Sequence, residues 1–477
     1  MCTAPFDSWS SPEEAGVSSA GLLRFLGAWE ELRGKVQFHS MILLRHGKIV
    51  CRMNFAPYDD VTPHVLFSLS KSFTSAAAGF AVSEGRLSWQ SSVVDVLPEE
   101  IPQGREDELR PVTLEALLCM GSGLDPASDS PSPDREITWA RHVLSHSIVH
   151  PPMTHFHYNS FGTYLVSCMV QKVTGQTVRD YLMPRLFEPL GIRRPAWDLS
   201  PEGICCGGFG LHLTAGDISR FGQCLLQKGR WQGRQVLPEG WVELATREHI
   251  ANYEGERQDG NEWGQGYGFQ FWRCMEGRYR GDGAMGQACI VDEARDAVLA
   301  VTCGTDDMGE EFRLIREYIF PAFDAENGSA AEQEALRGRI AALAYGFPED
   351  DGSAGSLPEG IYAAPFQGGV CRISLRAFAM DQVELCLHFG PGETLPFYLR
   401  RGHAGLCAMA AGNPPVRYFG CCGWDRGRLR VSMRTPDGPD TVDGVFTWED
   451  DRLVFDGTGV HFPGGHVVFS RESAAGV

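Results

Sequence analysis

Phe67-Ser68-Leu69-Ser70-Lys71-Ser72-Phe73-Thr74 is the segment on which the interpretation of this chain depends. Residues 68–84 are dense in Ala, Phe, Leu and Val, and Gly85 follows them, which predicts a buried helix with a glycine stop. Ser68 and Lys71 are three residues apart, so their side chains project from one face of that helix. The helix N-terminus and burial would lower the pKa of Lys71, whose amine could then take the proton of the Ser68 hydroxyl. We predict Ser68 as a nucleophile and Lys71 as its base.

The surroundings of Ser68 strengthen this prediction. Its backbone N–H has no partner within the first helical turn and can face a developing oxyanion. Only one of the chain's five lysines has a serine three residues before it. The alternative is that Lys71 is a solvated side chain at the start of a helix.

A second segment, Phe156-His157-Tyr158-Asn159-Ser160, precedes another predicted helix over residues 160–174. Tyr158 therefore lies at a junction between a loop and a helix, where side chains can converge on a pocket. A phenol near a cationic lysine can be partly ionised, and so act as a general base or acid. The alternative is an interfacial tyrosine, with Asn159 or Ser160 capping the helix.

A third segment, Arg280-Gly281-Asp282-Gly283-Ala284-Met285-Gly286-Gln287, leads into the apolar strand Ala288-Cys289-Ile290-Val291. Glycines at the edge of a strand allow a substrate backbone to approach closely. The alternative is that they belong to an ordinary β-hairpin.

The other patterns of the first 330 residues place helices between two groups of strands. Residues 40–52 predict a β-hairpin, and residues 265–274 and 286–303 are rich in strand-forming side chains. Residues 215–227 predict one of the helices in between. This order favours one antiparallel sheet, with terminal segments paired and helices covering it.

A change of period marks a second domain. Residues 346–360 have the composition of a linker, and beyond them apolar side chains alternate, as at 383–389. We expect a catalytic domain at 1–328, a short helix and linker at 329–357, and an antiparallel β-barrel or sandwich at 358–477.

Composition excludes several classes of function. Lys and Arg total 42 against 61 Asp and Glu, and the resulting net charge of -19 argues against a nucleic-acid or membrane partner. Residues 1–7 lack the basic run and following apolar stretch of a signal peptide, so we expect a cytoplasmic protein. The 15 cysteines form no C-x-x-C pair and the histidines no H-E-x-x-H set, which favours reduced core thiols and no metal site.

Together, the three segments resemble the motif set of the penicillin-binding-protein and β-lactamase superfamily, in order and in spacing. Three further stretches resemble its class C-like serine hydrolases: Leu117-Leu118-Cys119-Met120-Gly121-Ser122-Gly123-Leu124, Phe187-Glu188-Pro189-Leu190-Gly191-Ile192, and residues 263–272. The resemblance covers roughly residues 8 to 325. It implies an α+β fold, in which a β-lactamase-like domain has an antiparallel sheet flanked by helices and an all-helical lobe. The all-β domain would follow it.

The resemblance implies roles for the residues of the first two motifs. Ser68 would be the acylated nucleophile, with Lys71 as its base partner. Tyr158 would be the tyrosine of the family's Y-x-N motif, which shuttles protons to the leaving group. Ser160 holds the third place of that motif, where the pattern usually has Asn, and Asn159 stands one place earlier. Either of these two side chains could meet the substrate.

The third motif departs most from the family. Gly281-Asp282-Gly283 occupies the K-T-G place, and the backbone N–H of Ala284 would be the second oxyanion donor. Gly281 replaces the basic residue that helps to bind the substrate carboxylate in β-lactamases and D-alanyl peptidases. Arg280 lies next to it but should point to the opposite face of a strand.

We therefore expect a hydrolase that cleaves a small-molecule ester or amide through an acyl-enzyme on Ser68, without a cofactor. A β-lactamase or D-amino-acid peptidase using the same residues is the second interpretation. A non-catalytic binding protein on a hydrolase scaffold is the third. The C-terminal β domain could cover the active site, mediate a homodimer or bind a ligand.

Overall fold

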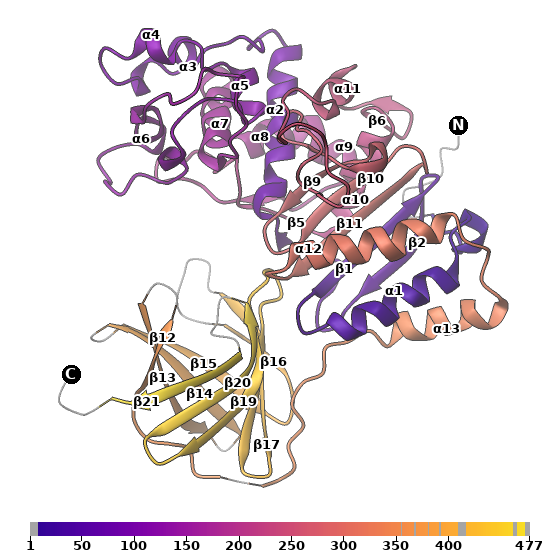
Figure 1. Ribbon diagram of the computed structural model, residues 1–477, viewed down its shortest axis with the longest axis vertical. Helices are drawn as coiled ribbons and strands as arrows, with labels where there is room; N and C mark the ends of the chain where they lie inside the picture. The colour runs from indigo at the N-terminus through magenta and orange to yellow at the C-terminus, as the bar shows by residue number, and fades with distance from the viewer. Residues whose placement is uncertain are drawn as a thin grey trace.

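The computed structural model describes residues 8–353, 355–366, 369–379, 381–390, 393–408, 416–460 and 465–472. These residues form a helical lobe, a central antiparallel sheet with helices on both faces, and a C-terminal domain of strands (Figure 1). The expected α+β class, with an all-β C-terminal domain, is confirmed.

The central sheet pairs strands from the two ends of its domain. Its order is β2-β1-β11-β10-β9-β8, and every neighbouring pair is antiparallel. The strands are β1 (Gln37–Arg45), β2 (Lys48–Asn54), β8 (Trp272–Arg273), β9 (Tyr279–Gly283), β10 (Gln287–Asp292) and β11 (Ala297–Gly304). The hairpin expected at 40–52 is β1 and β2. Of the residues at 265–274, which are rich in strand-forming side chains, only Trp272 and Arg273 join the sheet.

Alternate side chains of the central sheet point to opposite faces and pack in two different hydrophobic cores. Ile42 and Leu44 of β1 pack on the side of α10 (Ala215–Leu226), and Met41 and Leu43 face α1 (Ser19–Leu32). On the α1 side the cover is completed by α12 (Met308–Leu314) and α13 (Ala330–Ala341). Burial of both faces fixes the register of the strands, because a slip of one residue would exchange the two sets of side chains.

The helical lobe is built around two long helices that contact each other, α2 (Ser70–Ser83) and α7 (Ser160–Thr174). Around them lie α3 (Val93–Val96), α4 (Glu106–Leu109), α5 (Leu114–Leu118), α6 (Trp139–Ser145) and α8 (Val178–Leu182). Near the sheet lie α9 (Glu188–Leu190) and α11 (Trp241–Thr246), and the short strands are β3 (His64–Val65), β4 (Ala196–Trp197), β5 (Leu211–Leu213), β6 (Arg230–Trp231) and β7 (Arg234–Gln235). The lobe and the sheet meet at the start of α2.

The C-terminal strands form a closed barrel, which is one of the two expected forms. They are β12 (Tyr362–Phe366), β13 (Gly369–Ala379), β14 (Gln382–Gly390), β15 (Glu393–Arg401), β16 (Gly405–Ala408), β17 (Arg417–Asp425), β18 (Arg428–Arg434), β19 (Thr441–Glu449), β20 (Arg452–Val460) and β21 (Gly465–Arg471). Their order is β15-β14-β13-β12-β21-β20-β19-β18-β17-β16 with antiparallel neighbours, and a parallel pairing of β15 with β17 closes the barrel. Closure leaves fewer sheet edges open to other chains.

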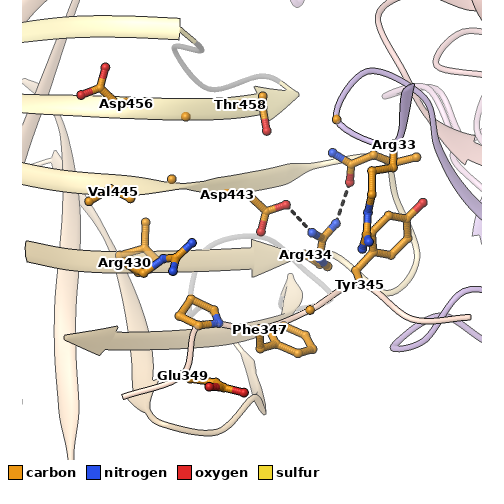
Figure 2. Close-up of a pocket in the computed structure, with 17 residues that line it drawn as sticks. Arg33, Tyr345, Phe347, Glu349, Arg430, Arg434, Asp443, Val445, Asp456 and Thr458 are labelled. Atoms are coloured by element: carbon orange, nitrogen blue, oxygen red, sulfur yellow. Dashed lines mark hydrogen bonds and ion pairs between the residues drawn. The ribbon is translucent and has the colours of Figure 1, made fainter. Parts of the chain in front are cut away.

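The barrel docks against the catalytic domain through the β18–β19 hairpin. At its base Arg434, which is 3% exposed, donates to Gln37 Oε1 at 2.6 Å and to the Asp443 carboxylate. Figure 2 shows these bonds at the wall of a cavity of about 670 Å³ between the two domains. In the hairpin loop, the carbonyl of Asp437 accepts the N–H of Val65 at 2.9 Å. The barrel thus touches the strand that immediately precedes the Ser68 segment.

Among the described residues, no helix combines the length and the apolar character that crossing a membrane requires.

Candidate active site

Ser68 lies in a single 3-10 turn, Phe67–Leu69, that leads directly into α2. Phe67 has a φ of 44°, a left-handed conformation that is rare for a bulky residue. The turn presents a half-buried Ser68 at the N-terminal end of the helix, where the helix dipole favours negative charge. The predicted helix is confirmed, and a tight turn at the serine forms its first residues.

Lys71 points at Ser68 from the next turn of the helix. Its Nζ lies 2.9 Å from Ser68 Oγ, 3.0 Å from Ser160 Oγ and 2.8 Å from the carbonyl oxygen of Gly208. The side chain is only 1% exposed, and this desolvation lowers the pKa of Lys71 to about 7, although Asp129 and Asp282 act in the opposite direction. Above that pH most of the lysine is a neutral amine, which is the form that accepts a proton.

Asn159 and Ser160 have different surroundings. Asn159 caps α7, because its Oδ1 accepts the N–H of Gly162 at 2.6 Å, and its Nδ2 donates to Ser128 Oγ at 2.7 Å. Its side chain is thereby paired inside the lobe. Ser160 instead turns its hydroxyl to Lys71. Of the two candidates, the structure brings Ser160 to the Ser68–Lys71 pair.

Tyr158 completes the cluster. Lys71 Nζ lies 4.7 Å from the centre of its ring. The ring stacks on Trp272, with centroids 5.4 Å apart. Burial, and secondarily the charge of Asp282, raise the pKa of Tyr158 well above its ordinary value. A raised pKa favours the protonated phenol, and the role of Tyr158 as a general base or acid stays a prediction.

The third motif passes close to the start of α2. A Cβ atom on Gly283 would lie 2.1 Å from the carbonyl oxygen of Leu66, and one on Gly281 would lie 2.4 Å from Ser72 Oγ. The two glycines are needed for this approach of β9 to the serine turn. Ala284 follows the end of the strand and is exposed. Its role as an oxyanion donor stays a prediction.

Asp282 and Arg280 lie together on the other face of β9, as expected for Arg280. Arg280 Nε donates to Asp282 Oδ2 at 2.9 Å, and Trp263 Nε1 donates to the same oxygen at 3.2 Å. Both charged side chains are at least nine-tenths buried. Arg280 therefore does not take the place of the basic residue that is missing at Gly281.

Two contributors to the site escaped the sequence analysis. Asp129 Oδ1 accepts the backbone N–H groups of Ser160 at 2.7 Å and Phe161 at 3.1 Å, which holds the start of α7 near Lys71. Gly208 contributes only its carbonyl oxygen. Neither position stands in a recognisable pattern, because a backbone acceptor and an isolated aspartate acquire their roles through long-range folding.

In the part of the chain that the structure describes, no group of three or more His, Cys, Asp or Glu side chains is arranged to hold a metal ion.

Comparison with known proteins decides the family. The family model described as Beta-lactamase matches residues 35–322, which contain all three motifs and the central sheet. The chain belongs to the beta-lactamase family. As a member of it, the protein is a serine hydrolase, and the resemblance recognised in the sequence is confirmed.

Relatives within the family carry hydrolase and penicillin-binding names. A 6-aminohexanoate-dimer hydrolase from Paenarthrobacter ureafaciens is 24% identical over 310 residues, 61% of this chain and 78% of that protein. Penicillin-binding protein 4 from Amycolatopsis lactamdurans is 27% identical over 252 residues, which cover 46% of this chain and 65% of that protein.

Solved structures extend the likeness in fold. EstCE1, described as a hydrolase with promiscuous acyltransferase activity, superposes with a TM-score of 0.53 at 16% identity, covering 63% of this chain and 99% of its own. The octameric penicillin-binding protein homologue from Pyrococcus abyssi has a TM-score of 0.50 at 17% identity and covers 94% of this chain and 100% of its own. The second likeness reaches beyond the family model into the barrel.

Proposed function

We propose that this beta-lactamase-family hydrolase cleaves a small-molecule ester or amide through an acyl-enzyme on Ser68. The observation that carries the proposal is the contact of 2.9 Å between Ser68 Oγ and the Nζ of a buried lysine whose pKa is lowered to about 7. A neutral amine at this distance can accept the hydroxyl proton as the oxygen attacks.

The proposed reaction has two steps that balance in protons. In the first, Lys71 takes the proton of Ser68, the serine oxygen bonds to the substrate carbonyl, and the N–H groups of Ser68 and Ala284 stabilise the oxyanion. Tyr158 then gives its proton to the leaving alcohol or amine and recovers one from Lys71. In the second step, water attacks the acyl-enzyme, its proton passes to the same pair, and Ser68 is regenerated with release of the acid.

The absence of a base at position 281 favours esters and amides over β-lactams. Gly281 offers no charge for a substrate carboxylate, and the space of a side chain there is filled by Ser72 and Leu69. Lys71 directs its nitrogen to three protein oxygens and is not available as a substitute. A β-lactamase or D-amino-acid peptidase with this chemistry remains the second candidate.

The test is a profile of the full chain across esters, anilides and a chromogenic cephalosporin. We expect ester or anilide hydrolysis that is lost in Ser68→Ala and Lys71→Met, with weak turnover of the cephalosporin. Ser83→Ala, at the far end of the same helix, is the matched control and should keep full activity. Efficient cephalosporin hydrolysis would favour the second candidate. Hydrolysis that persists in Ser68→Ala would refute the proposed nucleophile.

A further inference from the structure

The turn between β9 and β10 carries Ala284, the proposed second oxyanion donor. A hydrogen bond from the N–H of Gly286 to the carbonyl oxygen of Gly283, at 3.2 Å, closes this turn. The peptide bond between Gly283 and Ala284 is trans, so its C=O and its N–H point in opposite directions. Because the carbonyl points into the turn, the Ala284 N–H points out of it. Within the described part of the chain this N–H has no acceptor.

The turn has a conformation that its residues do not favour. Met285 has a φ of 63°, in the left-handed region that side chains other than glycine rarely adopt. Gly286 follows with a φ of 90°, and a Cβ atom there would lie 2.5 Å from Glu311 Oε2. A strained turn keeps its shape only where surrounding contacts hold it. The direction of the Ala284 N–H therefore depends on those contacts.

Gln287 connects the turn to the central sheet. Its side chain is fully buried, and its Nε2 donates to the carbonyl oxygens of Ala284 at 3.2 Å and of Cys303 at 2.9 Å. Its Oε1 accepts the N–H of Cys303 at 3.3 Å. The pairing of β10 with β11 ends at Ala288 and Val301, so the Gln287 amide takes over the bonds to β11 beyond that point. The turn is thereby tied to an inner strand of the sheet.

The three carbonyl groups of the turn each have a donor. That of Gly283 accepts from Gly286, and that of Met285 accepts the backbone N–H of Thr305 at 3.2 Å. The bond to Ala284 comes from the side chain of Gln287, so a substitution can remove it and leave the two backbone bonds in place.

We infer that Gln287 is a positioning residue for the reaction, whose amide holds the turn so that the Ala284 N–H is directed at the developing oxyanion. This inference rests on the proposed function, because it requires acyl transfer at Ser68 with Ala284 as a donor. A preorganised donor stabilises the transition state more than the bound substrate. Loss of the amide should therefore lower kcat and leave KM nearly unchanged.

The test compares an ester with its matched thionoester, in which sulfur replaces the carbonyl oxygen. Sulfur accepts hydrogen bonds only weakly, so the thionoester gains little from the oxyanion donors. The ratio of kcat/KM for the ester to kcat/KM for the thionoester reports those donors. It does not depend on how much of a preparation is folded, because both substrates meet the same active molecules.

Gln287→Met keeps the length of the side chain and removes its amide. We expect kcat for the ester to fall by about tenfold, less than the loss of an oxyanion donor itself, with KM nearly unchanged. The ester-to-thionoester ratio should shrink by a similar factor. If Gln287→Met does not fold, Gln287→Asn decides, because its amide is one carbon shorter and cannot keep the bonds to both Ala284 and Cys303; it should also reduce the ratio.

Gln223→Met is the matched control. Gln223 is a buried glutamine of α10, 3% exposed, and its Nε2 lies beside Gly47 in the β1–β2 turn, away from the β9–β10 turn. The same substitution there should leave kcat, KM and the ratio unchanged.

The outcomes separate this inference from the proposed function. A wild-type ratio near one, an unchanged ratio in the folded Gln287 variant, or a rise in KM at constant kcat overturns the inference, whereas hydrolysis that depends on Ser68 keeps the proposed function standing. If the wild-type chain shows no hydrolysis of the ester that depends on Ser68, the proposed function fails, and the inference with it.

Discussion

The acylation rate should fall at acid pH with the titration of Lys71. Burial lowers the pKa of Lys71 to about 7 in the folded protein, from an ordinary value of 10.5. In the proposed reaction the neutral amine is the base, so activity is expected on the alkaline side of that value. At pH 5 only about 1% of the lysine is neutral, and kcat/KM should be roughly a hundredfold below its plateau.

The assay is kcat/KM for a neutral, non-ionising ester between pH 5 and 9, because this parameter reports groups of the free enzyme. Asp129 and Asp282 raise the pKa of Lys71, so Asp129→Asn should move the acid limb to lower pH. The exposed Asp107→Asn should leave it in place. Two results would refute the assignment of Lys71 as the base. One is an acid limb of the kcat/KM profile whose midpoint lies near the ordinary pKa of a carboxyl group, and the other is a midpoint that Asp129→Asn moves to higher pH.

Further variants test three separate parts of the structure. Ser160→Ala removes a hydrogen-bond partner of Lys71 and should lower kcat/KM by about tenfold or more. Asn159→Ala removes the cap of α7 and should mainly lower the free energy of unfolding, by about 1 kcal/mol. The reverse pattern would show that Asn159, and not Ser160, takes part in the reaction. Glu311 is fully buried, and this burial raises its pKa to about 8. The folded protein therefore binds the Glu311 proton more tightly than the unfolded chain does. The free energy of unfolding should decline as the pH rises from about 4.5 to 8. Glu311→Gln should remove this decline and stabilise the protein at pH 8 by on the order of 4 kcal/mol in denaturant titrations. An unchanged pH profile of stability would contradict the burial argument. Arg434→Met breaks the bonds to Gln37 and Asp443 at the domain interface and should lower the free energy of unfolding by about 2 kcal/mol. Arg430→Met changes an exposed side chain of the same cavity and should leave this free energy nearly unchanged. Equal effects of the two variants would contradict a stabilising role of Arg434 at the interface.

Local patterns in the sequence predicted the elements that depend on neighbours along the chain. The β1–β2 hairpin, α7, α10 and the alternating strands of the barrel follow from periodicity and from turn residues. The spacing of Ser68 and Lys71 within one helix predicted their contact, because three residues bring side chains to one face.

Long-range contacts explain what the sequence did not reveal. The segment at 265–274 is rich in strand-forming side chains, but only Trp272 and Arg273 pair in the sheet, and Tyr267 and Trp272 pack against Tyr158. The bond from Asn159 to Ser128 and the approach of Asp129 depend on a loop about 30 residues away. The depth of burial that lowers the pKa of Lys71, and raises that of Tyr158, is likewise a property of the assembled site.

Some predictions from the sequence stay predictions. The fold does not test the homodimer, the cytoplasmic location, the absence of a nucleic-acid, membrane or cofactor partner, or the domain limits at 328 and 357.

The docking of the β18–β19 hairpin on Val65 gives the barrel a direct contact with the segment before Ser68.

The central claim is that Ser68 is the nucleophile, and covalent labelling tests it most directly. The full chain is treated with a fluorophosphonate, its intact mass is measured, and the modified peptide is mapped. We predict one adduct, located on Ser68, with none in Ser68→Ala and full labelling in Ser83→Ala. An adduct on another residue, equal labelling of Ser68→Ala, or no labelling of the folded wild-type protein would contradict the claim.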